Sequence, residues 1–262
     1  MAAVQMNGGT SPSTGQGIGG QSDVTARDER RLTGILGGMG PLSSAEFLKT
    51  IYECSPRGSA REQEAPAVVV YSDPSFPDRT SAFLAGRGEA VRAQLVEALT
   101  LLTRLGADRV VICCMTMHHL LPELPDGLRA RVLSLLDVIY GPLEESRRGH
   151  LVLCSTGTQK LRLFQRHPRW PAVADFVVFP DAADQERLHE LIYELKFNRA
   201  VHETCNFVEA LLKKYEAESF VVGCSEIHML AKHFFQKAAR RQAYGCIDPF
   251  ALIAANLAEG KL

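Results

Sequence analysis

The sequence has little net charge, no long hydrophobic run and no regular spacing of its cysteines. Its 29 Lys and Arg residues nearly balance its 30 Asp and Glu residues, so no global attraction to nucleic acid or anionic lipid is expected. No apolar run approaches the roughly 18–20 residues of a membrane-spanning helix, and the N-terminus does not show the basic-then-apolar pattern of a secretory signal. We therefore expect a globular, cytoplasmic protein with no nucleic-acid partner and no membrane partner.

Cysteine usage and the glycine pattern exclude two further classes of protein. Seven cysteines are an odd number, which favours free thiols in a reducing compartment over a disulfide framework. The glycine-rich turn GGMG at residues 37–40 lies between an apolar run and a helix, where phosphates often bind. It has neither the G-x-G-x-x-G spacing nor the lysine of a P-loop, so a dinucleotide site is not expected.

The order of apolar and amphipathic segments predicts an α/β fold. A tail at residues 1–30, rich in Gly, Ser, Thr and Gln, is predicted to be disordered. Apolar runs then alternate with helical patterns, which is typical of a parallel sheet covered by helices. Strands are predicted at residues 31–37, 65–74, 108–114, 150–154, 175–180 and 219–224, and helices from residue 41, at 88–105, after the turn at 155–158, at 184–196 and at 202–217. The strand at 65–74 is expected to be buried.

The chain repeats two of its segments, which predicts an internal duplication. Val110–Leu120 reads VVICCMTMHHL and Phe220–Leu230 reads FVVGCSEIHML, so a cysteine and a histidine recur at an offset of 110 residues. Gly34–Pro41 and Leu151–Thr158 form a second related pair, at an offset of 117. We therefore expect two similar parallel-sheet α/β domains related by pseudo-twofold symmetry, with the active site in the cleft between them, beyond the carboxyl ends of the strands.

The domain boundaries follow from interruptions of this pattern. The first domain is predicted at residues 31–140 and the second at 141–243, because Gly141, Pro142 and the charged run EESRRG interrupt the helical pattern there. Residues 244–262 are predicted to form a strand and a helix that pack back on the first domain.

Cys114 and Cys224 each end an apolar run, and three interpretations of the pair are open. Cysteine is often a buried packing residue, and Cys-x3-His occurs twice, which offers two sulfurs and two nitrogens to zinc. In the third interpretation, a thiolate removes a proton from one face of a small ligand and a thiol delivers one to the other face, as racemisation or epimerisation requires. A free thiol is little ionised at neutral pH, so His118 or His228 is expected to lower the thiol pKa or to relay the proton.

Five short motifs resemble the aspartate/glutamate racemase superfamily, and most closely its aspartate racemase branch. They occur in the same order from about residue 32 to the C-terminus: GILGGMGP at Gly34–Pro41, SDPSFPDRT at Ser72–Thr80, Cys-x-Thr at Cys114–Thr116, STGT at Ser155–Thr158 and GCSE at Gly223–Glu226. The resemblance implies two similar α/β domains with the active site between them. It also implies a homodimer that interconverts the enantiomers of an amino acid without pyridoxal phosphate or metal.

The resemblance implies roles for individual residues as well. Cys114 and Cys224 would be the catalytic acid/base pair, and Arg79 and Lys196 would bind the carboxylates of the substrate, a role to which the arginine fork is suited. Further substrate-binding positions would be Met39, Gly40, Ser72, Met115, Thr116, Thr156, Gly157, Thr158 and Ser225, with His118, Glu226 and His228 as supporting residues. No metal ligand is implied.

Met115 departs from the family pattern, which usually has Asn directly after the first cysteine. That amide helps to hold the α-carboxylate, and its loss removes a polar contact worth about 1–3 kcal/mol where it is buried. The sequence predicts a cofactor-independent racemase of aspartate, with glutamate second. Racemisation or isomerisation of another amino acid or dicarboxylate, and binding of an amino acid without turnover, remain open alternatives.

Overall fold

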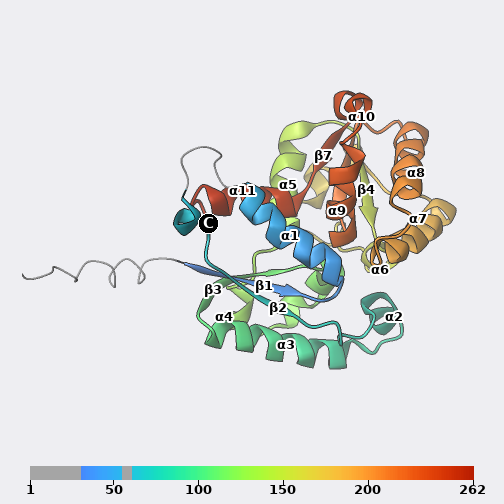
Figure 1. The fold of residues 1–262 in the computed structure, drawn as a ribbon. Coiled ribbons are helices and arrows are strands. Elements are labelled where there is room, and N and C mark those ends of the chain that lie inside the picture. Colours follow the sequence, from blue (N-terminus) through green and yellow to red (C-terminus); the bar gives the residue numbers. More distant parts are fainter. Residues whose placement is uncertain (1–30, 55–60) are drawn as a thin grey trace, which may run out of the picture. The chain divides into compact units, whose positions relative to one another are not determined.

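Two parallel sheets form the framework of the structure, a computed structural model that describes residues 31–54 and 61–262 (Figure 1). The first sheet has the strand order β2-β1-β3 and the second the order β5-β4-β6-β7, with parallel pairing throughout. The strands are β1 Leu32–Gly37, β2 Val68–Ser72, β3 Ala107–Ile112, β4 His150–Cys154, β5 Val177–Val178, β6 Ser219–Gly223 and β7 Gly245–Ile247. The first three strands of the second sheet repeat the order of the first sheet, and the α/β fold class is confirmed. The predicted disordered tail lies outside the described residues.

Helices connect the strands, as the alternating pattern predicts. α3 runs along the first sheet (Figure 1), with Val91, Leu95 and Leu102 on its buried face. Gly106 follows α3 with a φ of 92°, a left-handed conformation that favours glycine. The α-helices are α1 Pro41–Glu53, α2 Arg79–Leu84, α3 Gly88–Arg104, α4 Asp126–Arg129, α5 Leu135–Ser146, α6 Thr156–Lys160, α7 Ala182–Leu195, α8 Val201–Lys214, α9 Ser225–Phe234, α10 Ala238–Ala243 and α11 Pro249–Ala258, and the 3-10 helices are η2 Glu62–Glu64, η3 Met115–Glu123, η4 Trp170–Ala172 and η5 Ala174–Phe176. None of the helices in the described ranges combines the length and hydrophobicity that crossing a membrane requires.

β2 is a partly exposed edge strand, whereas the sequence predicted a buried one. It pairs only with β1 in its sheet, and Val70 is 39% exposed. The valine-rich run therefore reflects β propensity rather than burial on both faces. The other edge strand of this kind, β5, is shorter than the predicted strand at 175–180. An apolar run does not reveal which strand lies at the edge of a sheet, because that depends on pairing with distant segments.

α5 continues through the segment at which the sequence predicted an interruption. Gly141 and Pro142 lie inside this helix, although proline within a helix costs about 3 kcal/mol. The buried face of α5 includes Leu135, Ile139 and Leu143, and burying each such side chain contributes about 1.5–3 kcal/mol. The burial of this face therefore offsets the cost of the proline.

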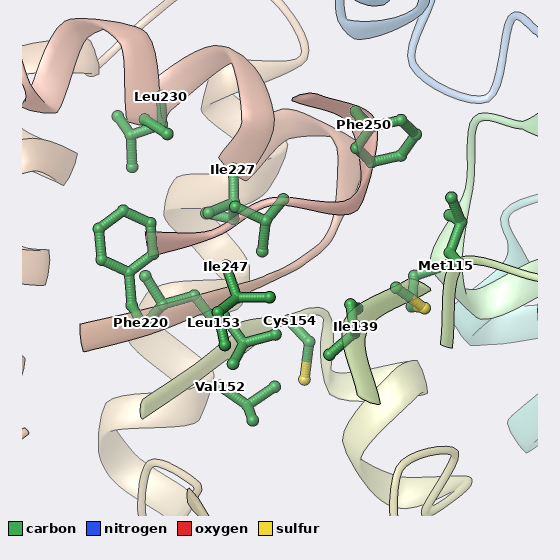
Figure 2. Packing of buried hydrophobic residues seen from close by; sticks show 14 of the residues in the cluster. Met115, Ile139, Val152, Leu153, Cys154, Phe220, Ile227, Leu230, Ile247 and Phe250 are labelled. Atoms are coloured by element: carbon green, nitrogen blue, oxygen red, sulfur yellow. The ribbon is translucent and has the colours of Figure 1, made fainter. Parts of the chain in front are cut away.

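One hydrophobic cluster extends over both halves of the chain. It contains residues of the second sheet and its surrounding helices, together with Ile35 of β1, Phe47 of α1 and Met115 of η3. Figure 2 shows Met115 and Cys154 among the labelled members of this cluster. A second cluster lies between α3 and the first sheet. The two sheets therefore share part of their core.

The C-terminal strand and helix divide between the two halves, which corrects the prediction for residues 244–262. β7 pairs with β6 and so extends the second sheet. α11 packs against α1, where the rings of Phe47 and Phe250 meet edge to face with 5.3 Å between their centroids. Pairing of the short strand is decided by the neighbouring edge of β6, which its own sequence does not show. The domain division at residues 31–140 and 141–243 stays a prediction.

Candidate active site

Cys114 and Cys224 occupy equivalent positions at the carboxyl ends of two strands. Cys114 is the second residue after β3, and Cys224 directly follows β6. Both have an extended backbone, with φ of −158° and −152°, and each immediately precedes a helix, η3 and α9 respectively. Ligands of open parallel sheets bind beyond this edge, so the two thiols lie where a ligand is expected.

Both cysteines line one narrow cavity of about 20 Å³. The lining residues are Met39, Asp78, Arg79, Thr80, Cys114, Thr116, Ser155, Ile192, Tyr193, Lys196, Cys224 and Glu226. This volume holds about one water-sized group, so an amino acid enters only when the lining side chains move apart. A wider depression of about 660 Å³ shares Met39, Asp78, Arg79 and Lys196 with the cavity. We expect a ligand to reach the cavity through that depression.

Arg79 is a buried cation at the start of α2. Its side chain donates to three backbone carbonyl oxygens at 2.7, 2.9 and 3.3 Å, the shortest of these bonds being that of Nη2 to Met39. Nε is also buried and has no hydrogen-bond partner among the described residues. Burial acts to lower the pKa of Arg79, but the charges of Cys114, Asp78 and Glu226 outweigh burial and raise it. Arg79 therefore stays cationic.

Lys196 approaches the same carbonyl oxygen as Arg79. It follows the last residue of α7, and Nζ donates to the Met39 oxygen at 3.4 Å. The ammonium also lies 4.8 Å from the centroid of the Tyr193 ring, whose hydroxyl donates to the carboxylate of Asp78. Two cations thus converge on one point of the cavity, a disposition that suits an anionic ligand.

Glu226 is a buried carboxylate beside Cys224. The thiol of Cys224 donates to Oε2 at 2.8 Å, and the hydroxyl of Ser225 donates to the same oxygen at 3.2 Å. Oε1 is buried and without a hydrogen-bond partner in the described part of the chain. Burial raises the pKa of the Cys224 thiol, and the charge and hydrogen bond of Glu226 raise it further, whereas the charge of Lys196 acts in the opposite direction. Cys224 is therefore a neutral thiol at neutral pH.

Three buried hydroxyl groups connect the two halves at the cavity. Thr116 Oγ1 lies 3.0 Å from Ser155 Oγ and 2.9 Å from Thr158 Oγ1. Ser155 also caps α6 by accepting from the amide of Thr158 at 3.3 Å. The turn that carries Cys114 is thus hydrogen-bonded to the turn that follows β4.

Comparison with known proteins identifies the family to which these features belong. Residues 36–257 match the family model described as Asp/Glu/Hydantoin racemase. The chain belongs to the Asp/Glu/hydantoin racemase family. The resemblance stated from the motifs is thereby confirmed.

Individual relatives are distant in sequence but similar over most of their length. The broad specificity amino-acid racemase RacX of Bacillus subtilis (strain 168) is 20% identical over 208 residues, which are 77% of this chain and 88% of that protein. The structure resembles Picrophilus torridus aspartate racemase with a TM-score of 0.72 at 20% identity, over 88% of this chain and 94% of that chain. It resembles an aspartate racemase homologue from Pyrococcus horikoshii OT3 with a TM-score of 0.63 at 20% identity, over 87% and 98% of the two chains. These structural similarities show that the chain has the racemase fold.

The racemase fold brings seven of the predicted site residues to the cavity. They are Met39, Arg79, Cys114, Thr116, Lys196, Cys224 and Glu226. Four other predicted residues contact lining residues without lining the cavity, namely Gly40, Gly157, Thr158 and Ser225. A Cβ at Gly157 would lie 2.6 Å from the hydroxyl of Thr80, so glycine permits the close approach of α6 to α2.

Ser72, Met115 and Thr156 are not among the lining residues. Ser72 is exposed at the end of β2, and the amide of Thr156 donates to a histidine ring at 3.4 Å. Met115 is 1% exposed and packs in the hydrophobic cluster (Figure 2), so its side chain does not replace a substrate-binding amide. Successive residues at this turn point to different sides, so Cys114 and Thr116 reach the cavity while Met115 enters the core.

His118 and His228 have partners other than the two thiols, which corrects the expectation that they act on them. His118 Nδ1 lies 3.1 Å from the carbonyl oxygen of Cys114, and Nε2 accepts from a backbone amide of α5 at 3.1 Å. His228 Nδ1 lies 2.6 Å from the carboxylate of Asp248, and Nε2 lies 2.9 Å from the hydroxyl of Thr50. Both nitrogens of each ring are thus engaged, and the two histidines hold turns and helices together.

The two Cys-x3-His segments do not form a metal site in this arrangement. Within residues 31–54 and 61–262, no group of three or more His, Cys, Asp or Glu side chains is arranged to hold a metal ion. Each histidine is directed toward the partners given above, although its spacing from the cysteine resembles that of zinc ligands.

Five lining residues were missed at the level of sequence: Asp78, Thr80, Ser155, Ile192 and Tyr193. The first two flank Arg79, and the third begins the motif STGT, so adjacency to the quoted motifs was an available signal. The two α7 residues precede Lys196 by four and three positions, the spacing that places side chains on one helix face. Helical periodicity around Lys196 was therefore the signal for this wall of the cavity.

Proposed function

We propose that this protein is a cofactor-independent racemase of acidic amino acids, aspartate before glutamate, with Cys114 and Cys224 as its acid/base pair. The observation that carries the proposal is that both thiols line one cavity together with the cations Arg79 and Lys196. Membership of the Asp/Glu/hydantoin racemase family and the similarity to aspartate racemases support it.

Racemisation removes a proton from one face of the α-carbon and delivers another to the opposite face. In the proposed reaction a thiolate takes the α-proton, so that the Cα–H bond breaks, an S–H bond forms and the electron pair is delocalised into the α-carboxylate. The opposing thiol then protonates the other face, which breaks its S–H bond and forms the new Cα–H bond. The configuration is inverted and one proton has passed from one sulfur to the other.

The cavity has groups that stabilise the charge of the intermediate carbanion. An amino-acid α-proton is very weakly acidic, so fixed cations and hydrogen-bond donors in a site with little water must supply most of this stabilisation. Arg79 and Lys196 are the two cations, and Arg79 Nε is a buried donor without a partner among the described residues. In this proposal the two cations neutralise the carboxylates of the substrate.

The proposal is tested by nuclear magnetic resonance of L-aspartate and L-glutamate in deuterium oxide, combined with chiral analysis of the product. The wild type should form the D-enantiomer with deuterium at the α-carbon and without added cofactor. Cys114→Ala and Cys224→Ala should each lose about 10²–10⁴-fold in rate, because each lacks one acid/base group. Cys54→Ala, which changes an exposed thiol, is the matched control. Full activity in either cavity variant would contradict the two-thiol mechanism, and no exchange of either acid by the wild type would contradict the substrate.

A broader substrate range is a second candidate function. It is favoured by the similarity to a relative that is named a broad specificity amino-acid racemase. The same exchange assay with a panel of L-amino acids separates the two candidates. Isomerisation of a dicarboxylate need not exchange an α-proton, and binding without turnover stabilises the fold without exchange, so these alternatives are separated as well.

We also propose that the protein is a cytoplasmic homodimer with no nucleic-acid partner and no membrane partner. All seven cysteines lie in the described ranges and are free thiols, which is typical of a reducing compartment. Sedimentation velocity should give a mass near twice that of the 28.8 kDa chain. A single monomeric species at micromolar concentration would contradict the dimer.

A further inference from the structure

Two buried polar atoms of the cavity have no hydrogen-bond partner. Across the described residues, five buried side-chain nitrogen or oxygen atoms lack a partner, and two of them belong to lining residues, Arg79 Nε and Glu226 Oε1. Buried polar atoms are normally paired, so an unpaired one calls for an explanation. One of these atoms is a cationic donor and the other a carboxylate acceptor, the complement of the carboxylate and the ammonium of an amino acid.

We propose that Glu226 binds the α-ammonium group of the substrate through Oε1 while Oε2 holds the thiol of Cys224. The inference rests on the proposed function, because it takes a free amino acid as the ligand. Oε2 already accepts from Cys224 and Ser225 at 2.8 and 3.2 Å, which leaves Oε1 as the free oxygen. Since both oxygens belong to one carboxylate, an ammonium on Oε1 places the attached α-carbon next to the Cys224 thiol.

Asp78 is the other carboxylate among the described lining residues, and its oxygens are already engaged. Oδ1 accepts from the amide of Ser81 at 2.8 Å and caps α2, and Oδ2 accepts from the hydroxyl of Tyr193. An ammonium on Asp78 would compete with these bonds. Glu226 is therefore the carboxylate with an acceptor available to a ligand.

Gly40 leaves the space in which the Glu226 carboxylate lies. A Cβ at this position would be 2.2 Å from Oε1 and 3.2 Å from the carboxyl carbon of Glu226. The φ of Gly40 is −163°, an extended conformation open to any residue, so the missing side chain and not backbone freedom explains the glycine. Any larger residue would displace Oε1 from its position.

This arrangement selects substrates that carry a charged primary amine. A buried carboxylate oxygen without a cation remains unpaired, so a dicarboxylate that lacks the amine gains nothing from Glu226. The substrate class is thereby narrowed to free α-amino acids, as distinct from hydroxy acids or N-acylated acids.

The test measures the affinities of racemic aspartate and of succinate, which lacks the amine, by isothermal titration calorimetry. A racemic ligand is used because turnover then does not change its composition. Glu226→Gln retains the shape of the side chain and an oxygen acceptor for Cys224. We expect this variant to bind aspartate about 10- to 100-fold more weakly than the wild type and to bind succinate as the wild type does. Equal losses for both ligands, or no loss for aspartate, would overturn the inference.

Two further variants keep the result interpretable. Gly40→Ala should reproduce the aspartate-selective loss, because it displaces Oε1 and leaves the carboxylate in the chain. Asp78→Asn is the matched control and should change the two affinities equally; an aspartate-selective loss in Asp78→Asn alone would assign the ammonium to Asp78 and overturn the inference. A wild type that racemises aspartate beside a Glu226→Gln variant of unchanged selectivity would leave the proposed function standing without this role. A wild type that binds neither ligand would contradict the acidic substrate and the inference together.

Discussion

Cys224 has a different electrostatic environment from Cys114, although the two residues are equivalent in the fold. Burial and Glu226 raise the pKa of Cys224, and only the thiolate reacts with iodoacetamide. Glu226→Gln should therefore lower this pKa and increase the alkylation rate of Cys224 between about pH 7 and 10. Mass spectrometry of the peptide that contains Cys224 measures the rate, with the exposed Cys54 as an internal control. An identical pH profile in both proteins would show that Glu226 does not influence the thiol.

His118 should remain neutral down to about pH 4, because burial lowers its pKa to about 4. Its Nε2 accepts from the amide of Leu135 and needs an unprotonated nitrogen. The folded-state pKa lies below the unfolded value of about 6.5, so the unfolded chain takes up the proton first as the pH falls. Stability from this group is present above about pH 6.5 and is lost progressively between about pH 6.5 and 4. A nuclear magnetic resonance titration, assigned with His118→Gln, measures the midpoint; a midpoint near pH 6.5 would contradict the burial argument.

At the scale of elements, the start of α11 is held by one carboxylate with two functions. Asp248 Oδ1 accepts from the amides of Phe250 and Ala251, and Oδ2 lies 2.6 Å from His228 Nδ1 on α9. Asp248→Ala should lower the free energy of unfolding by about 3 kcal/mol, from a lost cap and a lost buried charge-assisted hydrogen bond. Asp181→Ala, which removes the exposed cap of α7, should cost about 1 kcal/mol. Urea unfolding measures both values, and equal losses would argue against a structural role of the His228 contact.

Two glycines at different places in their elements should respond to alanine with opposite signs. An added Cβ at Gly141, inside α5, meets no atom within 4 Å, so Gly141→Ala should stabilise the protein by about 0.5–1 kcal/mol. An added Cβ at Gly37, at the end of β1, would lie 2.6 Å from Ser44, and Gly37→Ala should be destabilising. Chemical unfolding of both variants checks the signs; a stabilised Gly37→Ala would show that α1 shifts freely.

At the scale of the whole molecule, the hydrophobic cluster shared by the two sheets predicts one cooperative unfolding transition. Trp170 is the single tryptophan of the chain and packs against that cluster in the second half. Its fluorescence reports on the second half, whereas far-ultraviolet circular dichroism reports on the helices of both halves. The two signals should give the same urea midpoint. Separate midpoints would show that the halves unfold independently.

Most secondary structure and part of the site could be predicted because their signals are local. Period and turn residues placed β1, α1, α3, β3, β4, α7, α8 and β6 close to their observed bounds. The same periodicity placed Cys114 and Cys224 at strand ends, although their catalytic role remains a proposal. The exposure of β2 and the continuation of α5 through Pro142 could not be predicted in this way, because both depend on contacts with distant segments.

The sequence by itself determined the alternation of strands and helices, the duplicated cysteine segments and the resemblance to the racemase family, since each is expressed in neighbouring residues. Only the tertiary structure decided which side chains meet. It directed Met115 into the core, gave His118 and His228 other partners, and left one oxygen of Glu226 free beside Gly40. The physical reason is that hydrogen bonds and packing between residues far apart in the chain depend on how the two sheets pack through their shared core, and no local pattern contains that information.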